Sequence, residues 1–532
     1  MAMEEQKYYL KQNVQIDPLF NHWYAYPQLI SPATAAMHIA NSHLKIMNSY
    51  VMSPDVHAAA VKNPAMRGGP FIDYQGKRVD EIKELMLKTQ SKQAHMLELA
   101  EAIKSLNDLL VREAKGYSIE ALYPKVPQAL RGYVELVYDL NHNPSFRLME
   151  ALLYKSEYYD PSSQSVILSL VESDDRPFAY STPRLEEEGR LQLNIAFSHP
   201  GIDELFKMRE VPQTFGYIKE ALGLKNGQDA MLATFLTEAT PPRTPKYQGD
   251  SVRIRYFGHA CVLIETKDVS VLTDPVISYD YANDDENRYT YADLPDSIDY
   301  VVITHSHADH LMFESLLQLR HKIKNVVVPR NGGGSLEDPS LKLVLQNTGF
   351  NNVIEVDELD SIEIEGGSID AVPFLGEHAD LNIRTKTAYL VRLGGKQTLF
   401  MADSNNLEFM VYDHIQRLYG DVDVLFIGME CDGAPLTWIY GSLFSKAIDR
   451  KMDRSRRLSG SDFASALDIV NRLNCKKAYV YAMGQEPWLG YLTSIKYTNE
   501  SRPIVESDKL VEACKQQGTF CERLYGSKEI AI

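Results

Sequence analysis

Four metal-binding side chains lie close together in the sequence His-Ser-His-Ala-Asp-His at residues 305–310. Residues 300–303, Tyr-Val-Val-Ile, precede Thr304 and this motif and are typical of a buried strand. Successive side chains of an extended chain alternate in direction, so we expect His305 and His307 to point the same way. The turn that follows should bring Asp309 and His310 to a second point nearby. The motif therefore predicts a strand-end loop that binds two adjacent metal ions.

The chain divides at a proline-rich segment. Its 532 residues exceed one ordinary domain, and three prolines within residues 239–245 are typical of a linker. We predict an N-terminal α+β domain over residues 1–240, helix-rich, with one long helix over 79–113. Beyond residue 250, short strands alternate with helices, which indicates a layered α/β domain over 250–532.

Charge and composition exclude several classes of function. Lys and Arg number 55 against 72 Asp and Glu, so the net charge is −17, which argues against nucleic acid or an anionic membrane as the main partner. No apolar run approaches the roughly 20 residues that a membrane-spanning helix needs. The five scattered cysteines form no C-x-x-C pair and are typical of a reducing compartment. We therefore expect a cytoplasmic protein without a disulfide framework.

Five short motifs beyond the linker resemble those of the metallo-β-lactamase fold family. They are Gly-His-Ala at 258–260, Thr-Asp-Pro at 273–275, the histidine motif at 305–310, Gly-Glu-His at 376–378 and Ala-Asp-Ser at 402–404. The resemblance implies a C-terminal αββα sandwich. It also implies that the first metal takes the two leading histidines and a later third ligand. The second metal takes the Asp-His pair and a late histidine, and an aspartate, here Asp403, bridges the two ions.

Two departures from that family bear on the chemistry. The third ligand position holds Glu377, with His378 beside it, and the chain has no late histidine because its last one is His414, on an expected surface helix. Carboxylate-rich sites with open positions suit iron or manganese better than zinc, which favours nitrogen and sulfur donors. The ligand set implied by the resemblance is His305, His307, Asp309, His310, Glu377 and Asp403.

This altered ligand set is similar to that of the diiron β-hydroxylases of nonribosomal peptide biosynthesis, a group typified by the enzyme of the chloramphenicol pathway. The resemblance covers the whole chain. It implies two iron ions and a monooxygenase that uses O2 and an external electron donor. The implied substrate is an aminoacyl thioester on the phosphopantetheine arm of a carrier domain. The N-terminal domain would then serve dimerisation and carrier docking. The amino acid, the partner synthetase and the electron donor stay open.

Several further side chains have more than one interpretation. Glu430 and Asp432 follow an apolar strand and either lie behind the ligands, contact the substrate amine, or form a turn. His259 either hydrogen-bonds a metal ligand or is a buried structural histidine. The densest basic run either docks the carrier, since arginine suits phosphate, or forms a solvated loop; its cations are Arg450, Lys451, Arg454, Arg456 and Arg457.

The main alternative function is a dinuclear zinc hydrolase, in which two metal ions activate water. It would be favoured if His378, rather than Glu377, were the third ligand. Oxygen or nitric oxide reduction, as in flavodiiron proteins, is weakened because no flavin-binding domain follows. A non-catalytic binding module is weakened because all six ligands are kept.

Overall fold

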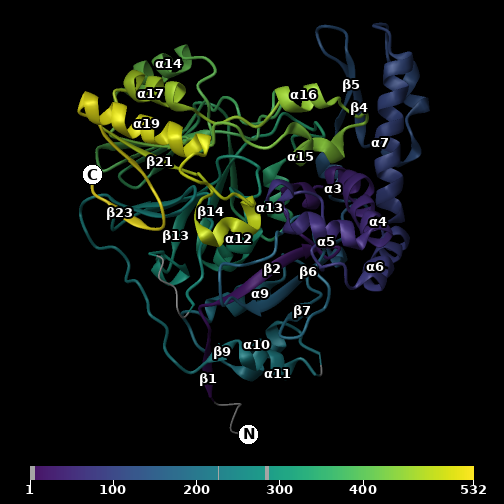
Figure 1. The fold of residues 1–532 in the computed structure, drawn as a ribbon, viewed down its shortest axis with the longest axis horizontal. Helices are drawn as coiled ribbons and strands as arrows, with labels where there is room; N and C mark the ends of the chain where they lie inside the picture. Colours follow the sequence, from purple (N-terminus) through teal and green to yellow (C-terminus); the bar gives the residue numbers. More distant parts are fainter. Residues whose placement is uncertain (1–5, 226, 282–286) are drawn as a thin grey trace.

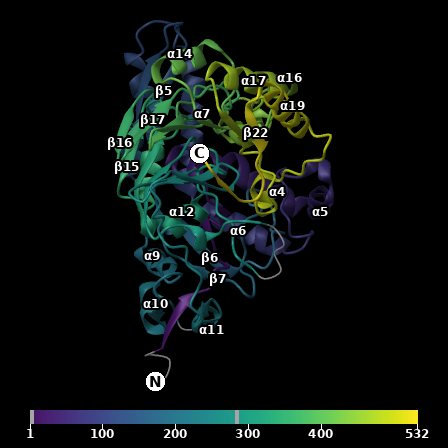
Figure 2. The same ribbon diagram turned by 90° about the vertical axis from the view of Figure 1, so that its left-hand side faces the viewer.

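The computed structural model describes residues 6–225, 227–281 and 287–532. Within the described residues, strands β1 to β9 pair only among themselves, and strands β10 to β23 pair only among themselves. No sheet therefore joins the two parts of the chain. The second group forms two seven-stranded sheets. Figures 1 and 2 show the N-terminal helices packed along one side of these sheets.

The first large sheet begins with β10 and β11, which join through a tight turn at Gly258 and His259. It contains, in spatial order, β15 (Val353–Val356), β14 (Ile323–Pro329), β13 (Ile298–Val302), β12 (Ser270–Thr273), β11 (Cys261–Glu265), β10 (Arg253–Gly258) and β23 (Lys528–Ile530). The β12 to β15 pairs are parallel and the others antiparallel. Parallel strands are buried on both faces, which explains the buried valines at 301 and 302 of β13 and at 326–328 of β14.

The second large sheet has the same mixed plan. It contains β16 (Ser361–Ile364), β17 (Gly367–Val372), β18 (Ala388–Leu393), β19 (Lys396–Phe400), β20 (Val424–Gly428), β21 (Lys477–Tyr481) and β22 (Phe520–Arg523). Alternate apolar side chains of both sheets form one shared core, which includes Val262, Val302, Tyr389 and Phe426. The two sheets therefore pack face to face.

Helices cover the outer faces of this sandwich. On the second sheet lie α14 (Met410–Tyr419), α17 (Phe463–Arg472) and α19 (Arg502–Gln517), whose apolar faces pack on strand residues such as Leu399 and Leu425. On the first sheet lie α12 (Phe313–Leu319) and α13 (Leu341–Asn347). Their core continues into the N-terminal domain. The expected αββα sandwich is thus confirmed, with one outer layer shared between the two parts of the chain.

The N-terminal part is a mixed α/β domain. Its sheets are β3 (Trp23–Tyr24), β2 (Val14–Phe20), β6 (Gln164–Leu170) and β7 (Leu191–Leu193); β8 (Gln213–Thr214), β1 (Lys7–Leu10) and β9 (Leu236–Thr237); and β4 (Val134–Tyr138) with β5 (Pro144–Leu148). Its helices are α2 (Pro27–Ile30), α3 (Pro32–His38), α4 (Leu44–Met52), α5 (Pro54–Lys62), α6 (Val79–Lys92), α7 (Ala94–Glu113), α8 (Glu150–Leu153), α9 (Pro200–Lys207), α10 (Phe215–Ala221) and α11 (Asp229–Thr234).

The prediction of a single helix over 79–113 is wrong, because Gln93 interrupts it and separates α6 from α7. Gln93 is buried and its amide donates hydrogen bonds to Asn21 Oδ1 and Ser163 Oγ. These contacts hold Gln93 in a non-helical conformation, with φ −105° and ψ 25°. Long-range polar contacts of this kind override helix propensity. Among the described helices, none is long and apolar enough to cross a membrane.

Candidate metal centre

The site residues lie in loops at one edge of the sandwich, where several strands end. The histidine motif follows β13, Asp403 follows β19 and Glu377 follows β17. Strands β17 and β19 both pair antiparallel with β18, so their carboxyl ends lie at the same edge. Loops beyond strand ends are where α/β folds build binding sites. Residues almost 100 positions apart are therefore brought into one cluster.

Two ligand groups lie side by side in this cluster. His305, His307, Glu377 and Asp403 are buried and place one ligand atom each within 4.8 Å of one another. A second group, with the same limit, contains His259, Asp309 and His310. The expectation of an extended chain through His307 is wrong, because the backbone bends at 306 and 307. The ring nitrogens His305 Nε2 and His307 Nδ1 nevertheless lie 3.1 Å apart.

Distances between ligand atoms match the edges of metal coordination shells. His307 Nδ1 lies 3.2 Å from Glu377 Oε1. Asp403 Oδ2 lies 3.6 Å from His305 Nε2 and 3.2 Å from His310 Nε2. Two ligands bound at about 2.1 Å with tetrahedral or octahedral angles lie roughly 3.0–3.4 Å apart. Asp403 stands between the two groups and has the position of a bridging carboxylate.

Polar partners hold the outer nitrogen of three histidines. Asp274, fully buried, accepts from Thr304 N at 2.7 Å and lies 2.8 Å from His310 Nδ1. Thr304 Oγ1 lies 3.0 Å from His305 Nδ1. The hydroxyl of Tyr440 lies 3.0 Å from His307 Nε2. Such outer partners fix the orientation of metal-binding imidazoles.

The side chain of His378 packs against the candidate ligands without joining them. Its ring centroid lies 4.6 Å from that of His307 and 5.6 Å from that of His305. Its Nδ1 lies 2.8 Å from the Tyr440 hydroxyl, and it belongs to neither group of ligand atoms within the 4.8 Å limit. Glu377, its neighbour, has a left-handed backbone with φ +67° after Gly376 with φ +83°, a strained conformation that clusters at functional sites. The carboxylate of Glu377 therefore joins the ligand group, while the imidazole of His378 hydrogen-bonds Tyr440.

The electrostatics of the cluster favour cations. Burial, with repulsion from Asp403 and Asp309, raises the pKa of Glu377 well above its usual value. Burial and neighbouring imidazoles keep the pKa of His305 well below its usual value, so the ring is neutral. The pKa of His310 is raised, since Asp403 and Asp274 outweigh its burial. The neutral imidazole of His305 and the crowded carboxylates suit a pair of metal ions, and His310 would give up its proton when a metal binds.

Several buried atoms of the cluster are free for metal bonds. Within the described residues, no hydrogen-bond partner is present for Glu377 Oε2, Asp403 Oδ1 or His310 Nε2. Unpaired buried polar atoms are costly and rare. The donor set of imidazoles and carboxylates is also the set that non-haem iron takes. The residues therefore fit two iron ions.

The remaining expected residues are placed as follows. Glu430 lies beyond β20, where burial, with repulsion from the carboxylates of Glu377 and Asp403, raises its pKa well above the usual value. Asp432 is exposed and pairs with Arg502 instead. His259 Nε2 lies 3.4 Å from Asp309 Oδ2.

Three residues at the site were not singled out as site residues from the sequence. Asp274 lies in the Thr-Asp-Pro motif at 273–275. Glu486 lies in the late part of the chain, where the metallo-β-lactamase fold family would have its late histidine. Glu486 Oε1 accepts a hydrogen bond from His259 N at 3.1 Å and so helps to fix the β10–β11 turn. Tyr440 lies in α15 (Leu436–Tyr440), and no pattern in the sequence pointed to it.

The basic run is helical at its start and divides into two sets. Residues 450–455 form helix α16 (Arg450–Ser455), where Arg450, Lys451 and Arg454 are exposed. The last two arginines bind main-chain carbonyls: Arg456 Nε donates to Ala379 O at 3.1 Å, and Arg457 Nη2 donates to Gly433 O at 2.7 Å. They brace the loops that follow Glu377 and Glu430.

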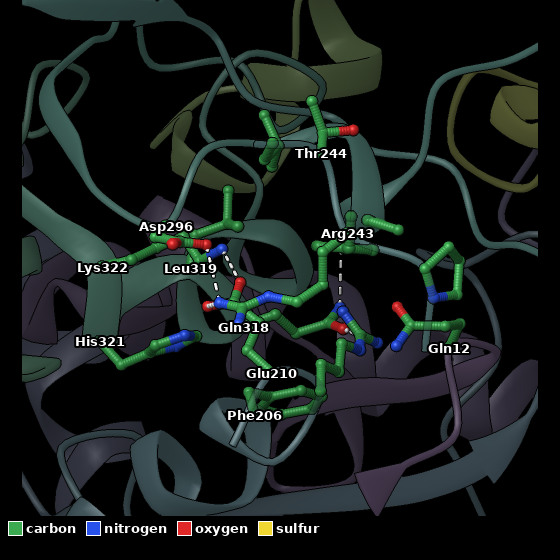
Figure 3. A pocket seen from close by; sticks show the side chains of 15 residues that line it. Gln12, Phe206, Glu210, Arg243, Thr244, Asp296, Gln318, Leu319, His321 and Lys322 are labelled. Carbon is green, nitrogen blue, oxygen red and sulfur yellow. Dashed lines mark hydrogen bonds and ion pairs between the residues drawn. The ribbon is translucent and has the colours of Figure 1, made fainter. Parts of the chain in front are cut away.

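A pocket at the junction of the linker with both parts of the chain is a different feature (Figure 3). Phe206, Arg243 and Lys322 are among its lining side chains, and the pocket contains none of the metal-ligand candidates. The charged groups of Arg243 and Lys322 both form ion pairs with Glu210. The pocket therefore belongs to the packing of the domains and not to the metal centre.

Known proteins resemble this chain along both parts. Residues 9–241 match the family described as diiron non-heme β-hydroxylase N-terminal domain, and residues 270–438 match the β-lactamase superfamily domain. The 4-amino-L-phenylalanyl-[CmlP-peptidyl-carrier-protein] 3-hydroxylase of Streptomyces venezuelae is 38% identical over 526 residues, 98% of each chain.

Two solved structures agree with this relationship. The crystal structure of CmlA, a diiron β-hydroxylase from Streptomyces venezuelae, has a TM-score of 0.93 with 38% identity and covers 99% of both chains. A variant of CmlA β-hydroxylase has a TM-score of 0.91 with 37% identity, covering 99% of this chain and 100% of that one. The likeness therefore includes both domains and their relative arrangement.

Proposed function

This chain belongs to the diiron non-heme β-hydroxylase family, and from that membership we propose that it hydroxylates the β-carbon of an aminoacyl group carried on a peptidyl-carrier protein. The observation that carries the proposal is the carboxylate at the third ligand position. Glu377 lies against His307 where a zinc hydrolase of this fold would place a histidine. The zinc hydrolase alternative is correspondingly weak.

We assign the ligands as two sets that share Asp403. His305, His307 and Glu377 would hold the first iron, and Asp309 with His310 the second. This assignment is supported by the two groups of clustered ligand atoms and by the unpartnered carboxylate oxygens. When bound, the two iron ions supply the site at which O2 is reduced.

The proposed reaction replaces a β-carbon–hydrogen bond with a carbon–hydroxyl bond. One oxygen atom of O2 enters the product and the other leaves as water, which consumes two electrons and two protons from outside. An external electron donor is therefore part of the proposal. Asp274, Thr304 and Tyr440 keep the imidazoles oriented, so that the ligand geometry is set before substrate arrives.

Glu430 and the two remaining histidines receive supporting roles. We assign Glu430 to the amine of the aminoacyl group, because it is a carboxylate beside the ligands that no described side chain neutralises. His378 holds the hydroxyl of Tyr440, and His259 lies against Asp309. The surface position of Asp432 gives it no role at the metal centre.

The partner would be a carrier domain, and the assembly a homodimer formed through the N-terminal domain. The carrier follows from what the Streptomyces venezuelae relative acts on. The homodimer rests on the resemblance to the hydroxylase family alone. Light scattering of the purified chain measures its mass directly, and a monomer at working concentrations would remove dimerisation from the account.

The test of the function uses an aminoacyl-charged carrier domain. The iron-loaded chain is incubated with reductant and isotopically labelled O2, beginning with a carrier that holds 4-amino-L-phenylalanine, the residue named for the relative. Mass spectrometry should find one labelled oxygen atom in the aminoacyl group. The zinc-loaded chain is the control. Release of the free amino acid by the zinc form, with no oxygen incorporated by the iron form, would overturn the proposal in favour of a hydrolase.

A further inference from the structure

Helix α15 connects the protein surface to the metal ligands in a single turn. Its Tyr440 contacts His307 and His378, whereas Trp438 is 46% exposed. Trp438 Nε1 donates to Gly68 O at 2.9 Å, and its ring stacks on Phe178 with centroids 6.4 Å apart. Both partners belong to the N-terminal domain. Helix α15 therefore places a surface tryptophan at the interface between the domains and, two residues later, a tyrosine in contact with the candidate ligands.

The interface between the domains continues through contacts next to α15. Asn41 Nδ2 donates to Ser442 O at 2.7 Å, just beyond the end of the helix. Phe178 packs edge-on against Tyr180, with centroids 5.6 Å apart. The Tyr180 hydroxyl is buried and has no hydrogen-bond partner within the described residues. Aromatic and weakly polar groups thus line the interface between the domains, which suits an uncharged thioester arm more than a charged metabolite.

Cations with no acidic partner stand beside this entrance. Helix α16 packs on α15, where Asp453 Oδ1 accepts a hydrogen bond from Thr437 N at 2.9 Å. Asp449 is likewise used, as it caps Lys451 N and Met452 N. The two acidic residues of the run are therefore occupied by main-chain groups. Among the described residues, no carboxylate lies within ion-pair distance of the three cations of α16, which are Arg450, Lys451 and Arg454.

Exposed apolar side chains complete the surface. Met452 is 50% exposed on α16, and Met66 of the N-terminal domain is 44% exposed, two residues before Gly68. Arg67 is also exposed. Figure 1 shows α15 and α16 together beside α3 of the N-terminal domain. Methionine and arginine are enriched at protein interfaces, and the patch is positive in a chain whose net charge is −17.

We infer that this composite surface, made of α15, α16 and residues 66–68, docks the carrier domain and admits its phosphopantetheine arm beside Trp438. The inference rests on the proposed function and adds the place of the partner. The occupant is an acidic helical domain with a phosphodiester-linked arm. Arginine suits the phosphate group, and the acidic carrier surface complements the unpaired cations.

The test compares two substrates with the iron-loaded full chain. One is the carrier domain charged with the amino acid that the unaltered enzyme accepts, and the other is the same amino acid as a free pantetheine thioester, which lacks both carrier and phosphate. The double variant Arg450→Glu with Arg454→Glu should raise KM for the carrier substrate on the order of tenfold or more. It should leave kcat, and turnover of the free thioester, unchanged.

A matched control keeps the change in net charge constant. Lys509→Glu with Lys515→Glu reverses two exposed charges on α19, which lies apart from α15 and α16 in Figure 1, and should leave KM for the carrier unchanged. Added salt should raise KM for the unaltered enzyme and have little effect on the α16 variant. Equal KM values for the α16 variant, the control and the unaltered enzyme would overturn the docking surface. Absence of carrier turnover by the unaltered enzyme would instead overturn the function.

A second variant covers the case in which the α16 double variant loses iron. Lys451→Glu alone changes one side chain that makes no described side-chain contact, and it should raise KM for the carrier by a smaller factor with full iron content. An unchanged KM in this variant, at low salt, would contradict the proposal independently.

Discussion

Glu377 and His378 are adjacent in the chain but serve different partners. The left-handed backbone at Glu377 separates their directions, so that the carboxylate reaches His307 and the imidazole reaches Tyr440. An oxygen donor here makes the site richer in carboxylate than a zinc hydrolase site. The choice between the two neighbours is therefore the point at which the chemistry of this fold changes.

Replacing each neighbour in turn distinguishes their roles. Glu377→Ala should lower the iron content from about two atoms per chain to about one, because the first ion loses one of its ligands. His378→Ala, the matched control one residue away, should keep about two. Elemental analysis of both purified variants makes the comparison. If His378→Ala lost iron while Glu377→Ala kept it, the ligand assignment would be wrong.

Iron affinity should fall as the pH is lowered. Burial and repulsion from Asp403 raise the pKa of Glu377 in the metal-free protein, so that it retains a proton at pH values where an ordinary glutamate is ionised. Binding iron must displace this proton, whereas His305 is already neutral because its pKa is lowered. Anaerobic Fe²⁺ titrations between about pH 6 and about pH 8 should give tighter binding at higher pH. A pH-independent affinity would contradict the raised pKa.

At the scale of the elements, the site is a set of loops at the ends of strands. The loop after β13 and its two ligand pairs were predictable, because a histidine motif after an apolar run is a local signal. The hydrogen bond between Asp274 and His310 joins residues 36 positions apart, and the contact between Tyr440 and His307 joins residues 133 positions apart. Contacts at such separations depend on how the sheets pack. The sequence therefore placed Asp274 in a motif without showing its contact with His310, and it did not single out Tyr440.

The Asp274 clamp should matter mainly for the second iron. Asp274→Asn keeps the shape but weakens the charge-assisted contact with His310, and the loss of such outer partners typically costs about 10–100-fold in metal affinity. Asp370→Asn is the control, since Asp370 is equally buried but pairs with Arg392 away from the ligands. Fe²⁺ titrations of the two variants should differ by that factor. Similar Fe²⁺ affinities of the two variants would show that Asp274 does not contribute to iron binding.

At the scale of the whole molecule, one buried carboxylate joins the two domains. Glu314 of α12 lies four residues after His310 and accepts hydrogen bonds from Tyr24 at 2.6 Å and from Arg176 at 2.9 and 3.0 Å. Both partners come from the N-terminal domain. The helix that follows the metal motif is thus held by residues 290 and 138 positions earlier in the chain, and the N-terminal domain supports the site mechanically.

Removing this charge should destabilise the protein strongly. Glu314→Gln leaves the buried guanidinium of Arg176 with Asp17 as its one acidic partner among the described residues, and breaking a buried ion pair costs about 3–5 kcal/mol. Glu81→Gln alters an exposed pair with Arg78 and should cost less than about 1 kcal/mol. Denaturant unfolding of the two variants measures the difference. Equal losses would show that Glu314 does not join the domains energetically.

The sequence predicted the C-terminal fold better than the N-terminal one. The sandwich carries several local motifs, each at the end of a strand. The N-terminal part has helical and strand periodicity but no such motif, and its contacts with α12 join residues such as Tyr24 and Glu314, 290 positions apart. Its place beside the metal site, and the entrance at Trp438, became visible only once both domains were in contact.

The central claim is that this fold holds a pair of iron ions in a carboxylate-rich site. Elemental analysis of the purified chain tests it most directly. The account predicts about two iron atoms per chain, the number for which a paired site is built, with zinc displaced by iron on reconstitution. Zinc at the same stoichiometry, with no iron retained when both metals are offered, would contradict it.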